Sequence, residues 1–188
     1  MSETVLVISG ASGAIYGVKL AEILGSKARL VVTEAGRLTL KHECEGLTPE
    51  KLAKRTGAYL ESNDDIAAKS ASGSAKINAV VICPCSGTTL GKLSAGIGDN
   101  LATRSAIVAL KENRKLILVP RETPYATVHL ENMTKLSQWG ATIVPASPGF
   151  YNLPKTIDDM VDFVVSRILD HLDIENDLSK RWKGDEIS

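Results

Sequence analysis

A hydrophobic strand that runs directly into small polar residues is the feature that most constrains this sequence. The apolar residues 79–82 lead into residues 84–100, which are rich in Gly, Ser and Thr, and residues 101–110 follow with helical spacing. The pattern predicts a strand, a polar loop and a helix. Hydroxyl groups and backbone N–H groups at such a junction suit an anion or a heterocycle. The same residues also suit an ordinary capped helix.

Other apolar, β-branched runs repeat this pattern along the chain. Residues 4–9, 29–33 and 115–120 have the composition of parallel strands that are covered on both faces, and residues 141–145 form a shorter run of this kind. Segments with helical spacing separate them. We therefore expect one α/β domain over residues 1–172, with an open parallel sheet and helices on both faces. Residues 173–188 are charged and form a tail that is frayed or lies over a neighbour.

The composition narrows the class of protein. The chain has 188 residues, of which 44% are hydrophobic, and this is enough for a single domain with one core. Its 22 basic and 22 acidic residues cancel, which argues against a nucleic acid or a membrane surface as partner. Three cysteines do not make a disulfide framework, and we find no secretory signal or membrane-length apolar run. We expect a cytoplasmic protein.

The glycine loop after the first strand is a candidate nucleotide site. Its glycines stand at positions 10, 13 and 17, so the dinucleotide fingerprint G-x-G-x-x-G is not met, and Ser12 occupies the place of the second glycine. No Gly-Lys-Ser/Thr follows, which excludes a P-loop. The loop is either a nucleotide site with an added hydroxyl donor or a tight strand-to-helix turn.

Two more strand ends carry polar side chains to the edge where open α/β sheets bind ligands. One strand ends at Thr33, and another ends at Arg121 and Glu122. Glu43 stands between a histidine and a cysteine, but no metal-ligand spacing occurs in the sequence, so we predict no metal site.

Three further features have both a functional and a structural interpretation. Arg104 and Lys111 lie on one face of a predicted helix, which is either a cationic site or a solvated surface. The small residues 70–74 form a linker or a binding loop. Tyr151, in a proline-flanked aromatic pair, belongs to the core or to the wall of a ligand site.

Taken together, six ordered motifs resemble the flavin prenyltransferase family, whose members were long described as aromatic-acid decarboxylases of ubiquinone synthesis. The resemblance covers nearly the whole chain. It implies a flavodoxin-like or Rossmann-like domain that forms a homo-oligomer of twelve subunits, a dodecamer, with reduced FMN and dimethylallyl phosphate at subunit junctions. The motifs are Gly10-Ala11-Ser12-Gly13-Ala14-Ile15-Tyr16-Gly17, Pro84-Cys85-Ser86, Asp99-Asn100-Leu101, Val119-Pro120-Arg121-Glu122-Thr123-Pro124, His129-Leu130-Glu131-Asn132-Met133 and Pro148-Gly149-Phe150-Tyr151.

The resemblance also implies roles for individual residues. Catalysis would fall to Glu122, Glu43, Lys111 and Ser12, with Glu43 near the reactive edge of the flavin ring. FMN would be held by Gly10, Ala11, Ser12, Thr33, Ser86, Gly87, Thr88, Thr89 and Arg121. The prenyl phosphate would be held by Ser72, Gly73, Arg104, Lys111, Tyr151 and Arg167, with Trp182 covering the pocket. Many members have serine in place of Thr33, and residues 45–63 match no family motif.

The chemistry of the side chains agrees with this resemblance. Isoprenoid enzymes that use Mg²⁺ need clustered aspartates, and neither pair of adjacent aspartates is completed to such a motif. A metal-independent transferase needs cations for the departing phosphate and an acid to protonate it. Arg121, Arg167, Lys111 and Glu122 supply this set. We expect N5 of the reduced flavin to take the dimethylallyl carbon and C6 to close a further ring.

Other functions remain as alternatives. A flavin-dependent decarboxylase of the cysteine-decarboxylase type shares the fold but needs an early catalytic histidine, and Tyr16 follows the glycine loop here while His42 is poorly placed. A non-catalytic FMN carrier would not need cations for a second anion. Direct decarboxylation of aromatic acids is the older description of the family. The sequence does not identify the decarboxylase that uses the product, nor the choice between monophosphate and diphosphate.

Overall fold

Six parallel strands form a single sheet with helices on both faces. The computed structural model describes residues 3–181. The strands lie in the order β3-β2-β1-β4-β5-β6, so the order reverses between β1 and β4. Sequence analysis predicted an open parallel α/β sheet, and the structure confirms it. Strands and helices have these bounds: β1 Glu3–Ile8, α1 Ala14–Leu24, η1 Gly25–Lys27, β2 Ala28–Val32, α2 Glu34–Glu43, α3 Pro49–Thr56, β3 Tyr59–Glu61, η2 Lys69–Ala71, β4 Ile77–Cys85, α4 Gly87–Ser94, α5 Leu101–Lys111, β5 Lys115–Pro120, α6 Thr127–Gln138, β6 Thr142–Ile143 and α7 Ile157–His171.

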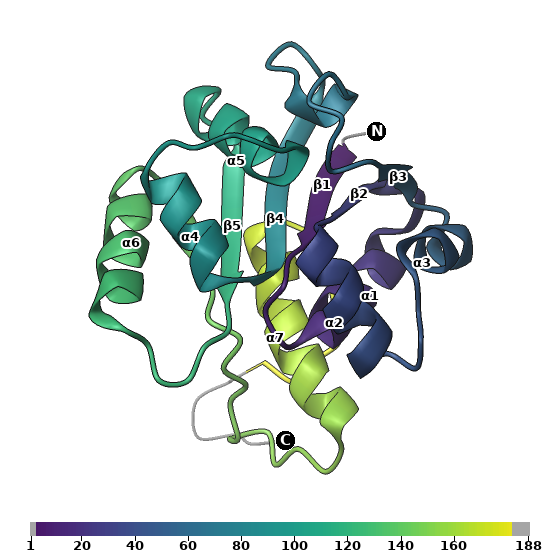
Figure 1. Cartoon of the computed structure of the whole chain (residues 1–188). Helices are drawn as coiled ribbons and strands as arrows, with labels where there is room; N and C mark the ends of the chain where they lie inside the picture. Colours follow the sequence, from purple (N-terminus) through teal and green to yellow (C-terminus); the bar gives the residue numbers. More distant parts are fainter. Residues whose placement is uncertain (1–2, 182–188) are drawn as a thin grey trace.

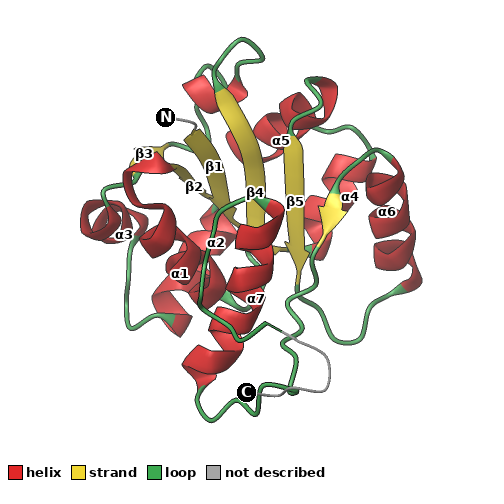
Figure 2. Cartoon of the chain, turned by 180° about the vertical axis from the view of Figure 1, so that it is seen from behind, coloured by secondary structure: helices red, strands yellow, loops and turns green. Residues whose placement is uncertain are grey.

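The sheet separates two hydrophobic cores. Leu6 and Ile8 of β1 face one core, which α1, α2, α3 and α7 complete, whereas Val5 and Val7 face the other, under α4, α5 and α6. Figures 1 and 2 show the two helical layers from opposite sides. Because alternate residues of a central strand enter different cores, each position favours an apolar side chain. This is why the strands appear in the sequence as continuous hydrophobic runs.

Local capping fixes where several helices begin. The hydroxyl of Thr156 accepts a hydrogen bond from the Asp159 N–H (3.1 Å), and the Asp159 carboxylate accepts one from the Thr156 N–H (2.9 Å). Asn100 and Thr103 form the same reciprocal arrangement at α5. Such boxes satisfy N–H groups that have no partner inside the helix. These boxes therefore fix the first residues of α5 and α7.

The segment after β4 differs from the prediction. Residues 84–100 were expected to be mainly a polar loop, but Gly87–Ser94 form helix α4. Its Leu90 and Leu93 are buried in the second core, and Ser86 caps its first turn. Burial and capping together outweigh the low helix propensity of its glycines and threonines.

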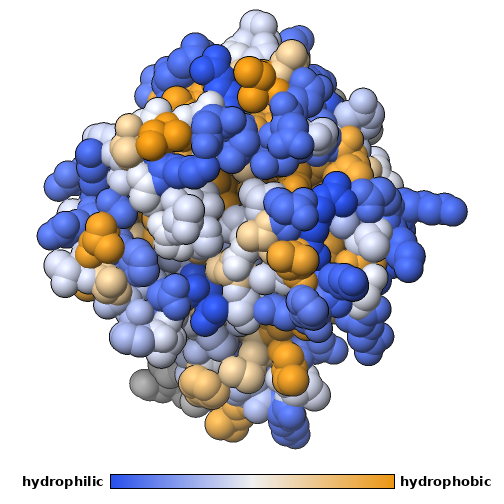
Figure 3. Space-filling model, viewed as in Figure 1, coloured by the Kyte–Doolittle hydropathy of each residue, from blue (hydrophilic) through white to orange (hydrophobic). Residues whose placement is uncertain are grey.

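The surface mixes polar and apolar side chains. Several separate apolar groups lie among hydrophilic residues on the face shown in Figure 3. The most exposed large apolar side chains include Phe150, Leu153 and Ile157, in and just after the loop that precedes α7, with 66%, 75% and 73% of their surface accessible. No helix within residues 3–181 is long and apolar enough to cross a membrane.

Candidate functional site

The carboxyl ends of β1 and β4 meet where the strand order reverses, which is the position at which open α/β sheets bind ligands. Ser9 links these two strand ends. Its hydroxyl donates to the Pro84 carbonyl (2.8 Å) and accepts from the Ser86 N–H (2.9 Å). The link brings the glycine loop of residues 10–13 beside the start of α4, and the family resemblance assigns both to the FMN site.

The first turn of α4 offers donors to an anion. Ser86 accepts a hydrogen bond from the Thr89 N–H (3.2 Å), and their two hydroxyls lie 2.9 Å apart. The N–H groups of Gly87 and Thr88 belong to the first turn and therefore have no partner inside the helix. Together with the positive end of the helix dipole, these groups fit a phosphate.

His129 packs against this turn, and sequence reasoning gave it no role. A β-carbon added at Gly87 would lie only 2.6 Å from Nε2 of His129. Glycine is therefore the residue that lets α6 approach α4 so closely. The only sequence signal for His129 was its place in one of the six motifs.

Glu43 caps the N-terminus of α1 from the end of α2. Its Oε2 accepts hydrogen bonds from the N–H groups of Gly13 and Ala14, both at 2.8 Å. Partial burial by itself would raise the pKa of Glu43, but hydrogen bonds from Ser12, Gly13 and Ala14 and the charge of Arg121 outweigh burial and lower the pKa. Glu43 is thus an ionised neighbour of Ser12, and its place beside a flavin ring stays a prediction.

The end of β5 joins the same crevice. Arg121 Nε donates to the carbonyl oxygen of Ser12 (3.0 Å), which ties this strand end to the glycine loop. Glu122 follows, partly exposed, and its Oε1 accepts a hydrogen bond from the Thr123 N–H (3.2 Å). On the other side, Thr33 caps α2 and its N–H donates to the Ile8 carbonyl (3.1 Å). One end of the sheet therefore gathers the predicted residues Gly10, Ala11, Ser12, Thr33, Glu43, Ser86, Gly87, Thr88, Thr89, Arg121 and Glu122.

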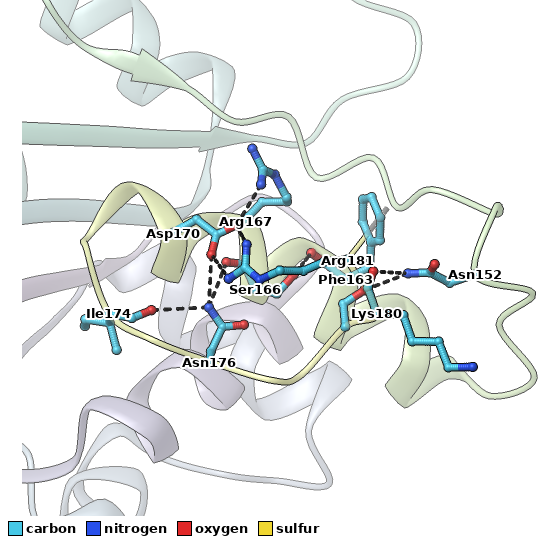
Figure 4. Close-up of polar contacts among 10 residues, drawn as sticks. Asn152, Phe163, Ser166, Arg167, Asp170, Ile174, Asn176, Lys180 and Arg181 are labelled. Atoms are coloured by element: carbon cyan, nitrogen blue, oxygen red, sulfur yellow. Dashed lines mark hydrogen bonds and ion pairs between the residues drawn. The ribbon is translucent and has the colours of Figure 1, made fainter. Parts of the chain in front are cut away.

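Tyr151 and Arg167 line a separate cavity of about 360 Å³ beside α7. The Tyr151 ring packs edge-on against Phe163, with ring centroids 5.6 Å apart. Arg167 Nη1 donates to Asp170 (2.6 Å), as Figure 4 shows. The sequence left Tyr151 between core and ligand wall, and the structure places it at the wall of this cavity. Asp170 is a further residue that sequence reasoning did not identify.

Three predicted residues lie at the end of the sheet where the strands begin, opposite the crevice: Ser72, Gly73 and Lys111. Ser72 and Gly73 precede the start of β4, and Lys111 precedes the start of β5. A β-carbon added at Gly73 would lie 3.1 Å from Lys111 Nζ, so loop and lysine are in contact. Parallel strands start at one edge and end at the other. The structure therefore does not bring these residues to Ser12 and Arg121 within one chain.

Two predicted residues remain to be placed. Arg104 is exposed in the first half of α5, on the same helix as Lys111. Trp182 lies outside the described residues. Within residues 3–181, no group of three or more His, Cys, Asp or Glu side chains is arranged to hold a metal ion.

Comparison with known proteins places the chain in a family. The Flavoprotein family model matches residues 2–169. The flavin prenyltransferase UbiX of Thermoplasma acidophilum is 48% identical over 179 residues, which cover 95% of this chain and 98% of that protein. The chain belongs to the flavin prenyltransferase family. The resemblance found in the sequence is therefore confirmed.

Solved structures of this family share the fold. A crystal structure of AnUbiX (PadA1) in complex with FMN and dimethylallyl pyrophosphate has a TM-score of 0.93 at 35% identity, and the match covers 98% of this chain and 99% of that one. A dodecameric FMN-dependent UbiX-like decarboxylase from Escherichia coli O157:H7 has a TM-score of 0.92 at 38% identity, with 97% and 100% covered. The expected flavodoxin-like fold of the flavin prenyltransferases is confirmed.

Proposed function

We propose that the chain transfers the dimethylallyl group of dimethylallyl phosphate to N5 and C6 of reduced FMN, and that a partner decarboxylase uses the prenylated flavin. The supporting observation is that hydroxyls, N–H groups of a helix first turn and Arg121 lie together at the β1/β4 crevice. The family and the AnUbiX complex with FMN and dimethylallyl pyrophosphate support the same function. The three cysteines are unpaired, which suits the cytoplasm.

The crevice has the donor set that FMN needs. The first turn of α4 suits the FMN phosphate, because its N–H groups and dipole favour a dianion. Ser12, Thr33 and Arg121 reach the same crevice from three other strand ends and offer hydroxyl and guanidinium donors to the flavin ring. Gly10 and Ala11 contribute backbone groups at the end of β1. The flavin supplies the nucleophilic nitrogen and ring carbon of the reaction.

The prenyl side of the reaction needs positive charge and a proton. A bond to N5 forms as the carbon–oxygen bond to phosphate breaks, so negative charge grows on the departing phosphate. Arg167 and Lys111 would stabilise that charge, and Glu122 would protonate the phosphate oxygen. Tyr151 lies in the same cavity as Arg167 and would contact the phosphate or the prenyl chain. Glu43 keeps Ser12 and the start of α1 in place beside the flavin.

We further propose that a second copy of the chain completes the site. Lys111, Ser72 and Gly73 lie at the edge opposite the flavin crevice, so they reach a flavin only in another subunit of a homo-oligomer. Exposed apolar side chains such as Phe150, Leu153 and Ile157 offer area for subunit contacts. The Escherichia coli relative is dodecameric, which supports an assembly of this kind.

Mixed oligomers test this proposal. Glu122→Gln and Lys111→Ala are each expected to abolish most of the transfer. When the two variants are co-expressed, about a quarter of randomly formed two-subunit sites would contain both intact halves, so activity should return to about that fraction of wild type. The measurement is the absorbance of prenylated flavin after anaerobic mixing of reduced enzyme with dimethylallyl phosphate. No recovery in confirmed mixed oligomers would show that one chain holds the whole site.

A further inference from the structure

The chain segment 174–181 returns over the cavity beside α7 and is held there at two points (Figure 4). At the first point, Asp170 Oδ1 accepts hydrogen bonds from Arg181 Nη2 (2.7 Å) and Asn176 Nδ2 (3.2 Å). At the second, Asn152 Nδ2 donates to the hydroxyl of Ser179 (2.9 Å) and to the carbonyl oxygen of Lys180 (3.0 Å). The segment is therefore fixed on both sides of the cavity that contains Tyr151 and Arg167.

Asp170 connects this segment to Arg167. Its Oδ2 accepts the hydrogen bond from Arg167 Nη1 (2.6 Å), and Arg181 of the returning segment donates to both oxygens, to Oδ1 from Nη2 (2.7 Å) and to Oδ2 from Nη1 (3.4 Å). The hydrogen bond from Arg181 lowers the pKa of Asp170 against the effect of partial burial, so the carboxylate is ionised at neutral pH. A guanidinium has five N–H donors in a fixed plane, and Asp170 takes only one nitrogen of Arg167. Asp170 thus orients this side chain and leaves donors for another anion.

We propose that Asp170 is a positioning residue of the prenyl phosphate site, which orients Arg167 and closes segment 174–181 over the same cavity through Arg181. This inference rests on the proposed function, because it takes Arg167 as a ligand of the phosphate. The closed segment brings Lys180 and Arg181 to the cavity, so three cations face one carboxylate there. Lys180 and Arg181 are then part of the substrate site, whereas Asp177 does not line the cavity.

The carboxylate has two opposite effects on a bound phosphate. Its charge repels the phosphate. Its hydrogen bond, however, already holds the Arg167 side chain in one orientation, so less side-chain entropy is lost when the phosphate binds. For one long side chain this entropy is worth about a 2- to 10-fold change in affinity. The Arg167 side chain, where the phosphate would bind, is 51% exposed and that of Asp170 is 20% exposed, so water and salt screen part of the repulsion. We therefore expect orientation to dominate.

Kinetics of Asp170→Ala distinguish these two effects. We expect the KM for dimethylallyl phosphate to rise about 2- to 10-fold, with kcat and FMN affinity changed less than about twofold. The matched control is Asp177→Ala, which removes an exposed acid from the same segment and should leave KM unchanged. An unchanged or lower KM in Asp170→Ala, or an equal rise in the control, would overturn the positioning role.

Limited trypsin digestion tests the closure without any activity. Cleavage after Lys180 and Arg181 should be faster in Asp170→Ala than in wild type or Asp177→Ala. Asn152→Ala releases the other attachment and keeps the Arg167–Asp170 contact, so it should also speed cleavage, even if Asp170→Ala folds poorly. Wild-type resistance in Asn152→Ala and Asp170→Ala would overturn the closure. If wild type instead forms no prenylated flavin, the proposed function fails, and the trypsin result still decides the closure.

Discussion

Glu61 and Arg29 form a buried ion pair that connects the sheet to the loop before β4. Arg29 Nη2 lies 2.6 Å from Glu61 Oε1, and the two side chains are only 10% and 4% exposed. Glu61 also accepts hydrogen bonds from the N–H and the hydroxyl of Ser70, two residues before Ser72. The centroid of the Tyr59 ring lies 4.5 Å from the guanidinium carbon of Arg29. This pair therefore holds the base of the loop that carries Ser72 and Gly73.

Glu61→Gln should lower the free energy of unfolding by about 3 kcal/mol. Removal of one partner from a buried ion pair costs about 3–5 kcal/mol, because the remaining charge is left without a counter-ion. Glu3 Oε1 remains 3.7 Å from Arg29 Nη1, so we expect the lower end of this range. The free energy of unfolding falls by about 1–3 kcal/mol per M of urea (the m-value), so the urea concentration at the unfolding midpoint should fall by about 1 M or more.

The assay is urea unfolding followed by circular dichroism, at one fixed protein concentration because the oligomer contributes to stability. Glu50→Gln is the matched control. It breaks another Arg–Glu pair, Arg37–Glu50 at 2.9 Å, whose side chains are 41% and 58% exposed. An exposed pair is worth at most about 1 kcal/mol. Equal midpoint shifts in the two variants would refute the argument from burial.

Three more predictions concern the crevice. Glu122→Gln should form prenylated flavin at least about a hundredfold more slowly in single-turnover absorbance, and a few-fold loss would exclude it as the acid. Ser12→Ala combined with Ser86→Ala should weaken FMN retention, by about 0.5–1.5 kcal/mol per hydrogen bond, and unchanged occupancy would contradict their assignment. The lowered pKa of Glu43 means that its cap stabilises the fold above about pH 4.5, the ordinary value, and is lost as pH falls further. In thermal melts, the deficit of Glu43→Gln should therefore shrink on acidification, and a constant deficit would contradict the cap.

The strands, and the end of the sheet at which the β1/β4 crevice lies, could be predicted because both follow from local patterns. Parallel strands buried on both faces give continuous apolar runs, and polar residues at their carboxyl ends must share one edge. Helix α4 was missed because Gly87, Thr88 and Gly91 have low helix propensity, while the burial of Leu90 and Leu93 that stabilises it is tertiary.

Contacts between segments that are distant in the sequence could not be predicted from the sequence pattern. Glu43 was predicted as a site residue, but nothing in its spacing indicated that it would cap α1, 30 residues from Gly13. Asp170 was one acid among many in a charged region, and only the return of Arg181 makes it a bridge. The resemblance implied ligands at subunit junctions without saying which side chains a neighbour supplies, and strand direction puts Lys111 and Ser12 at opposite ends of the sheet in one chain.

If a neighbouring chain supplies Lys111, as we propose, the reaction depends on protein concentration. A dissociated chain keeps every group of the crevice at the ends of β1, β2, β4 and β5, so it can still hold flavin. In the proposed two-chain site it lacks Lys111 and Gly73 of a neighbour, so it would not bind the phosphate of the prenyl substrate. On dilution, transfer should therefore fall at higher protein concentration than flavin binding does. Between these two concentrations, the protein would bind flavin without prenylating it, and reassembly of the oligomer would restore the transfer.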